Sequence, residues 1–153
     1  MKIYNATPGF GRTLSKQEIF EFLSNSKKNL QLASLDKKTE PNIHPVWFLF
    51  KNNLIYLATE RKSKKIQNII QNDLIYFSID EDNIKYRGVR GKGKAKVIDD
   101  IEFNKKIVKE ILLKYTGSLE GKLAEEIMEE VENGIEIVLE ITPKFFSTWE
   151  FTL

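Results

Sequence analysis

The segment from Asn42 to Ile70 constrains the fold more than any other part of the chain. Residues 43–50 are mostly apolar, an Asn-Asn pair follows shortly after, and residues 54–59 are apolar again. Asparagine tolerates the positive φ that a two-residue turn requires, so this pattern predicts two antiparallel strands joined by a tight hairpin. A helix with three inward-facing isoleucines is then predicted over residues 63–70.

The start of this helix carries an unusual concentration of positive charge, because Arg61, Lys62, Lys64 and Lys65 all gather there. A helix N-terminus has unpaired N–H groups and a partial positive charge, so acidic residues are favoured at that end and basic residues are not. The chain follows this rule elsewhere, for example in the capping box of residues 15–18. We therefore interpret the basic start as a site for an anionic group such as phosphate. The alternative is a solvated basic face on an ordinary surface helix.

The length and amino-acid composition favour a soluble globular protein with one domain over residues 1–153. Hydrophobic residues make up 41% and charged residues 30%, and the net charge of +2 is too small to indicate a nucleic-acid partner by itself. There is no cysteine and only one histidine, which excludes a disulfide framework, a thiolate zinc site and a multi-histidine metal site. No segment is apolar enough to be a signal peptide or to span a membrane, so we expect no metal, no membrane partner and a cytoplasmic location.

The remaining pattern predicts a mainly β fold, a small Greek-key β-barrel decorated by helices. Residues 1–13 are expected to form an irregular N-terminal arm. Further strands are expected over residues 29–35, 74–80, 84–98, 135–141 and 145–151, with Pro143 separating the last two. Further helices are expected over residues 15–23, 100–115 and 118–132. Because no β-α-β rhythm runs through the chain, a doubly wound parallel sheet is not expected.

The long strand over residues 84–98 suggests a second kind of partner. Arg90, Lys92, Lys94 and Lys96 alternate onto one of its faces, and such a basic stripe beside aromatic residues could bind a nucleic-acid backbone. We favour a simpler interpretation, in which the stripe is an exposed barrel face kept soluble by lysine. The acidic helix near the C-terminus counteracts the positive electrostatic potential that a nucleic acid would need. The glycines of this strand are not a dinucleotide-binding loop, since no helix follows them directly.

Several short motifs together resemble the pyridoxamine 5'-phosphate oxidase-like, FMN-binding split barrel. They are Pro45-Val46-Trp47-Phe48, Ala58-Thr59 at a strand end, Ser63-Lys64-Lys65 with Asn68, Tyr86-Arg87-Gly88-Val89 with Gly93-Lys94-Ala95, and Thr148-Trp149-Glu150-Phe151. Each motif is loose, but their order and spacing cover roughly residues 30–151. The resemblance implies a homodimer with the cofactor at the interface and an oxidoreductase that transfers hydride or electrons to an unknown small molecule.

The resemblance also implies roles for individual residues. Ser63, Lys64 and Lys65 would hold the FMN phosphate, and Lys65 is the residue on which we place most weight. Arg61 would assist them, and Thr59 would lie beside the isoalloxazine ring. The backbone of Val46, Trp47 and Phe48 would line that ring, and Trp149 would approach the ring of the partner subunit. No side chain is assigned as a catalytic acid, base or nucleophile.

Several alternatives remain open within this resemblance. The same scaffold serves the deazaflavin F420 in relatives, and the motif does not separate FMN from F420. A non-catalytic flavin carrier or sensor is a further alternative. The only histidine is His44, so the Arg-x-His substrate motif of authentic pyridoxamine 5'-phosphate oxidases is missing, and we do not expect the vitamin B6 activity itself. Trp47 could stack on a ring or fill the core or the dimer interface.

Overall fold

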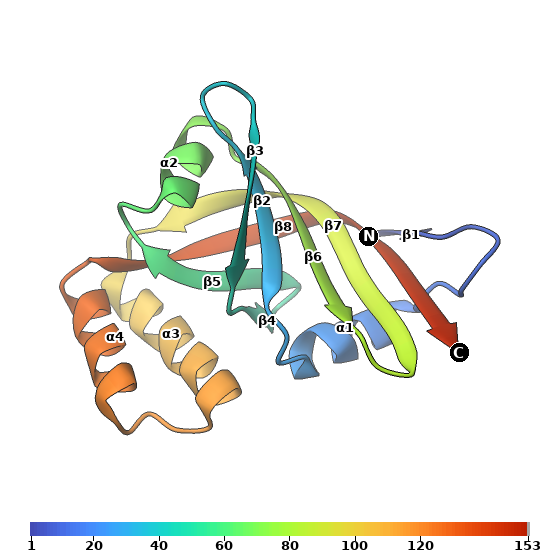
Figure 1. Cartoon of the computed structure of the whole chain (residues 1–153). Coiled ribbons are helices and arrows are strands. Elements are labelled where there is room, and N and C mark those ends of the chain that lie inside the picture. Colours follow the sequence, from blue (N-terminus) through green and yellow to red (C-terminus); the bar gives the residue numbers. More distant parts are fainter. Residues whose placement is uncertain (153) are drawn as a thin grey trace.

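The protein is described here by a computed structural model that covers residues 1–152 and contains eight strands and four helices (Figure 1). The strands are β1 (Lys2–Asn5), β2 (Leu30–Leu35), β3 (Pro41–Val46), β4 (Leu49–Lys51), β5 (Leu54–Glu60), β6 (Leu74–Glu81), β7 (Lys85–Ile98) and β8 (Glu136–Thr152). The helices are α1 (Lys16–Asn25), α2 (Lys64–Gln71), α3 (Ile101–Thr116) and α4 (Lys122–Glu132).

All strands belong to one strongly curved sheet with the order β3-β2-β6-β7-β8-β5-β4, and β1 adds to β8 in parallel. The other pairings are antiparallel, as short hairpins such as β2–β3, β4–β5 and β6–β7 require. Among the described residues, the two edge strands β3 and β4 do not pair with each other, so the sheet is not closed. The predicted mainly β barrel of the split type, with added helices, is thereby confirmed.

The inner side of the sheet holds the larger of two apolar cores. Two helices cover its ends, α1 near β4 and α2 near β2 and β7 (Figure 1). Helix α1 begins with the predicted capping box of Ser15 and Glu18 and contributes Ile19, Phe22 and Leu23 to this core. Helix α2 contributes Ile66 and Ile69, whereas Ile70, which was predicted to face inward, is exposed.

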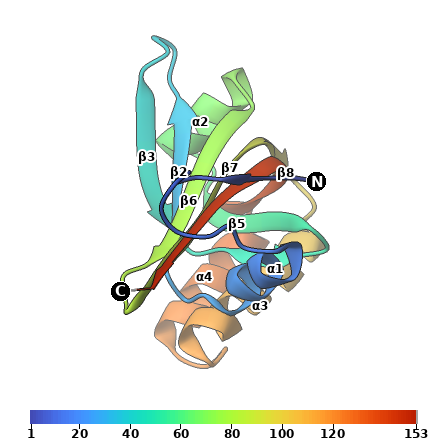
Figure 2. The ribbon, with the colours of Figure 1, turned by 90° about the vertical axis from the view of Figure 1, so that its right-hand side faces the viewer.

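A second apolar core lies on the outer side of the sheet, where the α3–α4 hairpin packs against β4, β5 and β8 (Figure 2). Tyr56 of β5 and Val138 of β8 point into it and meet the apolar faces of both helices. Asp100 caps α3 by accepting a hydrogen bond from the Phe103 amide, and Gly117 ends the helix with a left-handed φ of 75°. This second layer matters for the site because it covers one side of the strands that were predicted to bind the cofactor.

The strand predicted over residues 43–50 is in fact two strands, β3 and β4, separated at Trp47 and Phe48. The break is where the chain changes partners, since β3 pairs with β2 while β4 pairs with β5. The backbone at the break is satisfied by α3: the Phe48 amide donates to Tyr115 Oη at 3.3 Å, and the Phe48 carbonyl accepts from Lys114 Nζ at 3.1 Å.

The structure corrects two further details of the predicted strands. Part of the arm predicted to be irregular over residues 1–13 forms β1. Pro143 does not end a strand, because β8 runs through it. Pro143 lies opposite Gly93, next to a shift in the β7–β8 register, where a missing amide donor does no harm. In the part of the chain that the structure describes, no helix has the length and apolar character needed to cross a membrane.

Candidate functional site

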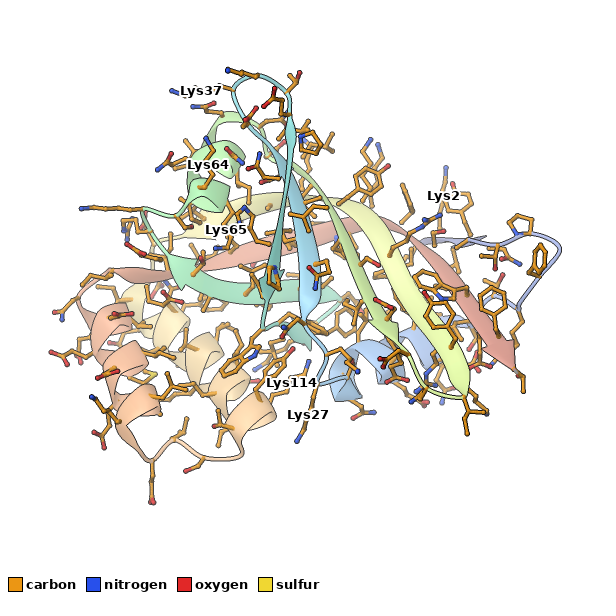
Figure 3. All side chains as sticks on the ribbon, in the orientation of Figure 1. Lys2, Lys27, Lys37, Lys64, Lys65 and Lys114 are labelled. Carbon is orange, nitrogen blue, oxygen red and sulfur yellow. The ribbon has the colours of Figure 1, made fainter. Side chains whose placement is uncertain are left out.

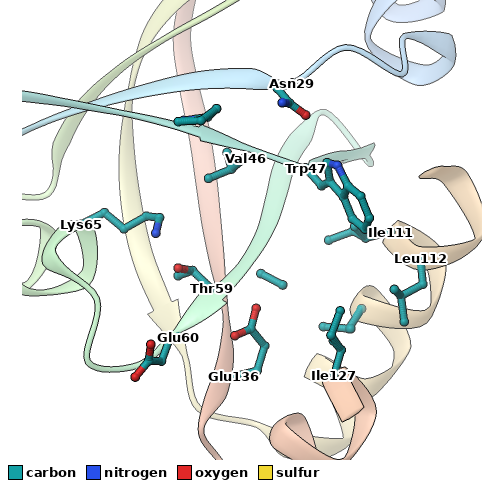
Figure 4. A pocket seen from close by; sticks show the side chains of 13 residues that line it. Asn29, Val46, Trp47, Thr59, Glu60, Lys65, Ile111, Leu112, Ile127 and Glu136 are labelled. Atoms are coloured by element: carbon teal, nitrogen blue, oxygen red, sulfur yellow. The ribbon is translucent and has the colours of Figure 1, made fainter. Parts of the chain in front are cut away.

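A cavity of about 360 Å³ lies between β3, β5, the start of α2 and the α3–α4 hairpin (Figure 4). Its walls come from both layers of the fold, the sheet on one side and the second apolar core on the other. The cavity has a polar end and an apolar end, so it suits a ligand with a charged or polar group attached to a flat or apolar body.

The polar end is formed by Thr59 and Glu60 at the end of β5, Lys65 in the first turn of α2, and Glu136 at the start of β8. Glu136 lies directly across from Glu60 in the β5–β8 pairing. Figure 4 shows the Lys65 ammonium and the Glu136 carboxyl pointing into the cavity, whereas the Glu60 carboxyl points away from it. Among residues 1–152, neither Lys65 nor Glu136 forms an ion pair.

The apolar end is formed by Trp47 and by side chains of the two outer helices, namely Val108, Ile111 and Leu112 of α3 and Ile127 of α4. The Trp47 ring is half-buried and stacks on Tyr115, with the ring centroids 4.8 Å apart and the planes within 5° of each other. The stack fixes the indole at the edge of the cavity as a flat wall, which suits an aromatic ligand.

The start of α2 lies next to the polar end, and it has neither a side-chain cap nor an acidic residue to balance its positive dipole end. Ser63 is the N-cap, yet its side chain makes no capping hydrogen bond, and the first turn contains no acidic residue. Its hydroxyl instead accepts a hydrogen bond from Thr59 Oγ1 at 3.4 Å. The first amide groups of a helix have no intrahelical partner, so this turn presents N–H donors together with a positive dipole end. The helix predicted at this position is confirmed, and its basic, acid-free first turn is the feature that suggested an anion site.

Of the residues predicted to bind a cofactor, Val46, Trp47, Thr59 and Lys65 are brought together as walls of one cavity. Ser63 is joined to them through Thr59.

The other predicted residues do not line the cavity. Phe48 is fully buried in the inner core, and only its backbone faces the strand break. Lys64 is exposed on α2, while the neighbouring Lys65 is half-buried (Figure 3). The Arg61 guanidinium is engaged elsewhere, by an ion pair to Asp99 at 2.6 Å and a hydrogen bond to the Gly134 carbonyl at 2.8 Å.

Trp149 lies far along β8 from the cavity. It is 8% exposed and packs over Gly88, with the ring of Tyr86 at 6.0 Å between centroids. Its indole N–H is buried and has no hydrogen-bond partner within the chain. The contact of Trp149 with a cofactor held by a partner subunit stays a prediction.

The carboxyl of Glu136 is the most perturbed acid of the site. Burial raises its pKa to about 7, with repulsion from Glu130 and Glu60 in the same direction and attraction to Lys65 against it. Burial lowers the pKa of the Lys65 ammonium, while Glu136 and Glu60 act to raise it. Burial and the nearby Lys65 charge also lower the pKa of His44, whose Nε2 is buried without a partner. A lysine and a carboxyl whose pKa lies near neutral pH therefore share one end of the cavity.

Sequence reasoning missed Glu136, Glu60 and the helical wall of the cavity. In the strand expected over residues 135–141, Glu136 alternates with apolar residues as a surface residue does, but the α3–α4 hairpin covers part of its side of β8. One signal was present: Val138 shares this face with Glu136, and an apolar residue on a supposedly solvated face indicates that something covers it.

The basic stripe on β7 is partly neutralised. Lys94 pairs with Asp73 at 3.2 Å and Lys96 pairs with Glu140 at 3.1 Å. The Lys92 ammonium lies over the Tyr76 ring, 6.0 Å from its centroid. These contacts reduce the positive charge available to a nucleic-acid backbone, and the cavity remains the stronger candidate.

The chain is similar to proteins of one known family. The family model described as pyridoxamine 5'-phosphate oxidase matches residues 15–150. No curated protein matches the chain significantly.

Three solved structures illustrate the likeness in fold. A conserved hypothetical protein from Mycobacterium tuberculosis is 21% identical with a TM-score of 0.78, over 95% of this chain and 90% of the other. A FAD-binding protein from Mesorhizobium loti is 20% identical with a TM-score of 0.67, over 91% and 96%. A protein named F420 reductase is 21% identical with a TM-score of 0.62, over 93% and 98%.

Proposed function

Because the chain belongs to the pyridoxamine 5'-phosphate oxidase family, we propose that it is a cytoplasmic FMN-binding oxidoreductase that works as a homodimer. The observation that carries the proposal is the cavity that joins Lys65 and the uncapped start of α2 to Val46 and Trp47. A bound flavin supplies hydride or electron transfer, and the chain's own residues bind it, orient it and shield it from water.

The polar end fits a phosphate by its chemistry. The first turn of α2 offers amide N–H groups and a positive dipole end, and Lys65 adds an ammonium without an ion-pair partner. The hydroxyls of Thr59 and Ser63 lie beside them and can donate as well. Lys64, which is exposed, would contribute long-range attraction, and Arg61 would help only by giving up its contacts with Asp99 and Gly134.

The rest of the cavity fits a flat ring. The edge formed by Pro45, Val46 and Trp47 lies where β3 ends and the backbone leaves the sheet, so part of that backbone is free of ladder hydrogen bonds. The Trp47–Tyr115 stack and the α3–α4 side chains provide apolar surface at the other end. Binding to such a mixed wall would hold an isoalloxazine ring by its faces and its polar edge.

The homodimer is supported by the part of the outer side of the sheet, over β3, β2 and β6, that no helix covers. Ile43 of β3 is 66% exposed and Tyr76 of β6 is 47% exposed, and two shallow, nearly apolar hollows lie beside them. Apolar surface of this kind on a folded chain marks an interaction site. A second copy placed on this face would also approach β3, which forms one wall of the cavity.

The proposal is tested by recording the absorption spectrum of the purified protein and then titrating the cofactor-free protein with FMN and with riboflavin, using flavin fluorescence. Lys65→Met should weaken FMN binding by at least about tenfold, because it removes the charge nearest the phosphate, and should leave riboflavin binding unchanged. Lys62→Met is the matched control, since Lys62 is exposed and does not line the cavity. The proposal fails if the wild type binds neither flavin, or if Lys65→Met binds FMN as well as the control does.

The F420 alternative is favoured by one observation, the structural likeness to the protein named F420 reductase. Parallel titration with FMN and F420 decides between the two, because both present a phosphate to the same helix start but differ in their rings and tails. Turnover assays with a panel of reductants and acceptors then separate an oxidoreductase from a flavin carrier or sensor. A protein that binds its flavin tightly but turns over no acceptor would support the second role.

A further inference from the structure

Glu136 lies in the cavity wall at a point where a cofactor phosphate would bring negative charge. Its carboxyl points into the same cavity end as the Lys65 ammonium (Figure 4). The β5–β8 register fixes it there, because Glu136 pairs with Glu60 one residue beyond Thr59. An ionised carboxylate at this point would repel a phosphate and would compete with it for Lys65.

The charged groups that act on Glu136 come from three elements. Glu60 of β5 and Glu130 of α4 are negative and disfavour a second negative charge, while Lys65 of α2 is positive and favours it. Helix α3 presents only apolar side chains to the cavity, namely Val108, Ile111 and Leu112. The environment of Glu136 therefore contains two acids, one base and an apolar wall, which favours the protonated form when the site is closed by a ligand.

We propose that Glu136 keeps its proton in the ligand-bound state and donates a hydrogen bond from its carboxyl group to the anionic group that Lys65 receives. This inference rests on the proposed function and adds a residue that determines specificity: Glu136 makes binding of a phosphorylated ligand depend on proton uptake. In the protonated state Glu136 adds a donor beside the Lys65 ammonium, and in the ionised state it adds a charge that repels the ligand's anionic group.

In the ligand-free protein, Glu136 can gain or lose its proton near neutral pH. Burial raises the pKa of Glu136 to about 7, so both protonation states are populated near neutral pH. Above that pH, Glu136 must take up a proton when such a ligand binds. Each further pH unit therefore reduces the affinity of the ligand about tenfold. A ligand without an anionic group does not need the proton and should bind equally well on both sides of pH 7.

The test measures the dissociation constants of FMN and riboflavin for the full chain from pH 6 to pH 8.5, in the wild type and in Glu136→Gln. The glutamine keeps a donor of nearly the same shape but cannot ionise. We expect wild-type affinity for FMN to fall about tenfold per pH unit above pH 7, while Glu136→Gln stays nearly flat. Riboflavin should show no such slope with either protein. Glu130→Gln, on the exposed side of α4, is the control and should keep the wild-type slope with a small shift in its midpoint.

The outcomes separate this inference from the proposal on which it rests. If FMN binds with the same pH dependence in the wild type and in Glu136→Gln, the role of Glu136 is wrong while flavin binding stands. If riboflavin shows the same slope as FMN, the carboxyl acts on the fold of the cavity and the inference is again wrong. If neither protein binds FMN at any pH, the proposed function is overturned and the inference falls with it.

Discussion

Lys114 is the residue whose environment departs most from what a lysine prefers. Its ammonium lies between α3 and α1 (Figure 3), donates to the carbonyls of Phe48 at 3.1 Å and Leu23 at 3.4 Å, and sits 3.7 Å from the centroid of the Phe48 ring. No carboxylate pairs with it among the described ion pairs. Its function is structural, since these contacts hold the strand break at Phe48 against the two helices.

The pH dependence of stability should reveal this lysine. Burial lowers the pKa of Lys114 from 10.5 to about 8, so between these values the unfolded chain binds more protons than the folded chain. The free energy of unfolding should therefore rise across this pH range. The contribution is on the order of 1–2 kcal/mol, after allowance for partial exposure of the side chain. Urea unfolding of the wild type and of Lys114→Met at pH 7.5, 9 and 10 measures it.

The comparison must rest on the difference between the two proteins, because other lysines and tyrosines also titrate at high pH. The wild type should gain stability relative to Lys114→Met as the pH rises. Parallel curves for the two proteins would show that the ammonium is solvated and that its contacts with Phe48 and Leu23 contribute little.

At the scale of the element, helix α2 lacks the interactions that usually stabilise a helix N-terminus. Compared with α1, which begins with a full capping box, α2 lacks both a side-chain cap and an acid in its first turn. Two elements of similar length in one chain thus differ in the feature that would bind an anion. If the N-terminus of α2 is uncapped because it binds a ligand, a capping residue should stabilise the ligand-free protein and weaken ligand binding.

Ser63→Asp tests whether helix stability and FMN affinity change in opposite directions. A charged N-cap should raise the free energy of unfolding of the cofactor-free protein by about 0.5–1 kcal/mol, because it complements the helix dipole. The same carboxylate should weaken FMN binding by at least about tenfold through repulsion of the phosphate, with riboflavin binding unchanged. Thermal unfolding and flavin titration measure the two effects.

Ser15→Asp is the matched control, because that helix start is already capped and lies outside the cavity. It should change neither stability nor FMN affinity appreciably. A Ser63→Asp protein that is more stable and binds FMN normally would place the phosphate away from α2.

The elements that sequence predicted well are those set by local rules. The capping box at Ser15, the Asn52-Asn53 turn and the helix after Ser63 depend on neighbours within a few residues, and all three are present. The break at Trp47 and the continuity of β8 through Pro143 were missed, because each depends on which strand lies alongside. Glu136 and the helical wall of the cavity were missed for the same reason, because nothing near Glu136 in the sequence shows that α3 and α4 cover its side of β8.

At the scale of the whole molecule, the two halves of the outer side of the sheet differ. The half formed by β4, β5 and β8 is covered by α3 and α4, whereas the half formed by β3, β2, β6 and β7 is open. A row of side chains crosses the open face in register, Ile43 beside Ala33, Ala33 beside Tyr76, and Tyr76 beside Lys92. Phe145 continues it, with its ring 6.3 Å from that of Tyr76. A row spanning several strands is a surface that a second copy could bury across a two-fold axis.

Ile43→Glu should therefore convert a dimer into a monomer. The substitution places a charge at the β3 end of the row, inside the proposed interface, where leaving it unpaired would cost several kcal/mol of association free energy. Light scattering after size exclusion should give twice the mass of the chain for the wild type and the mass of one chain for the variant. Ile84→Glu is the control, because Ile84 is 77% exposed in the turn between β6 and β7 and lies off the row.

Cofactor retention links this assembly to the site. Since Ile43 is three residues from Val46 on β3, a second copy docked on the row would lie beside the strand that forms one wall of the cavity. Ile43→Glu should then lose FMN together with the dimer, although it leaves Lys65 and the α2 start intact. If the monomeric variant keeps full FMN affinity, the cavity of a single chain is sufficient and the dimer does not share the site. If the wild type itself has the mass of one chain, the open face is covered by something other than a second copy.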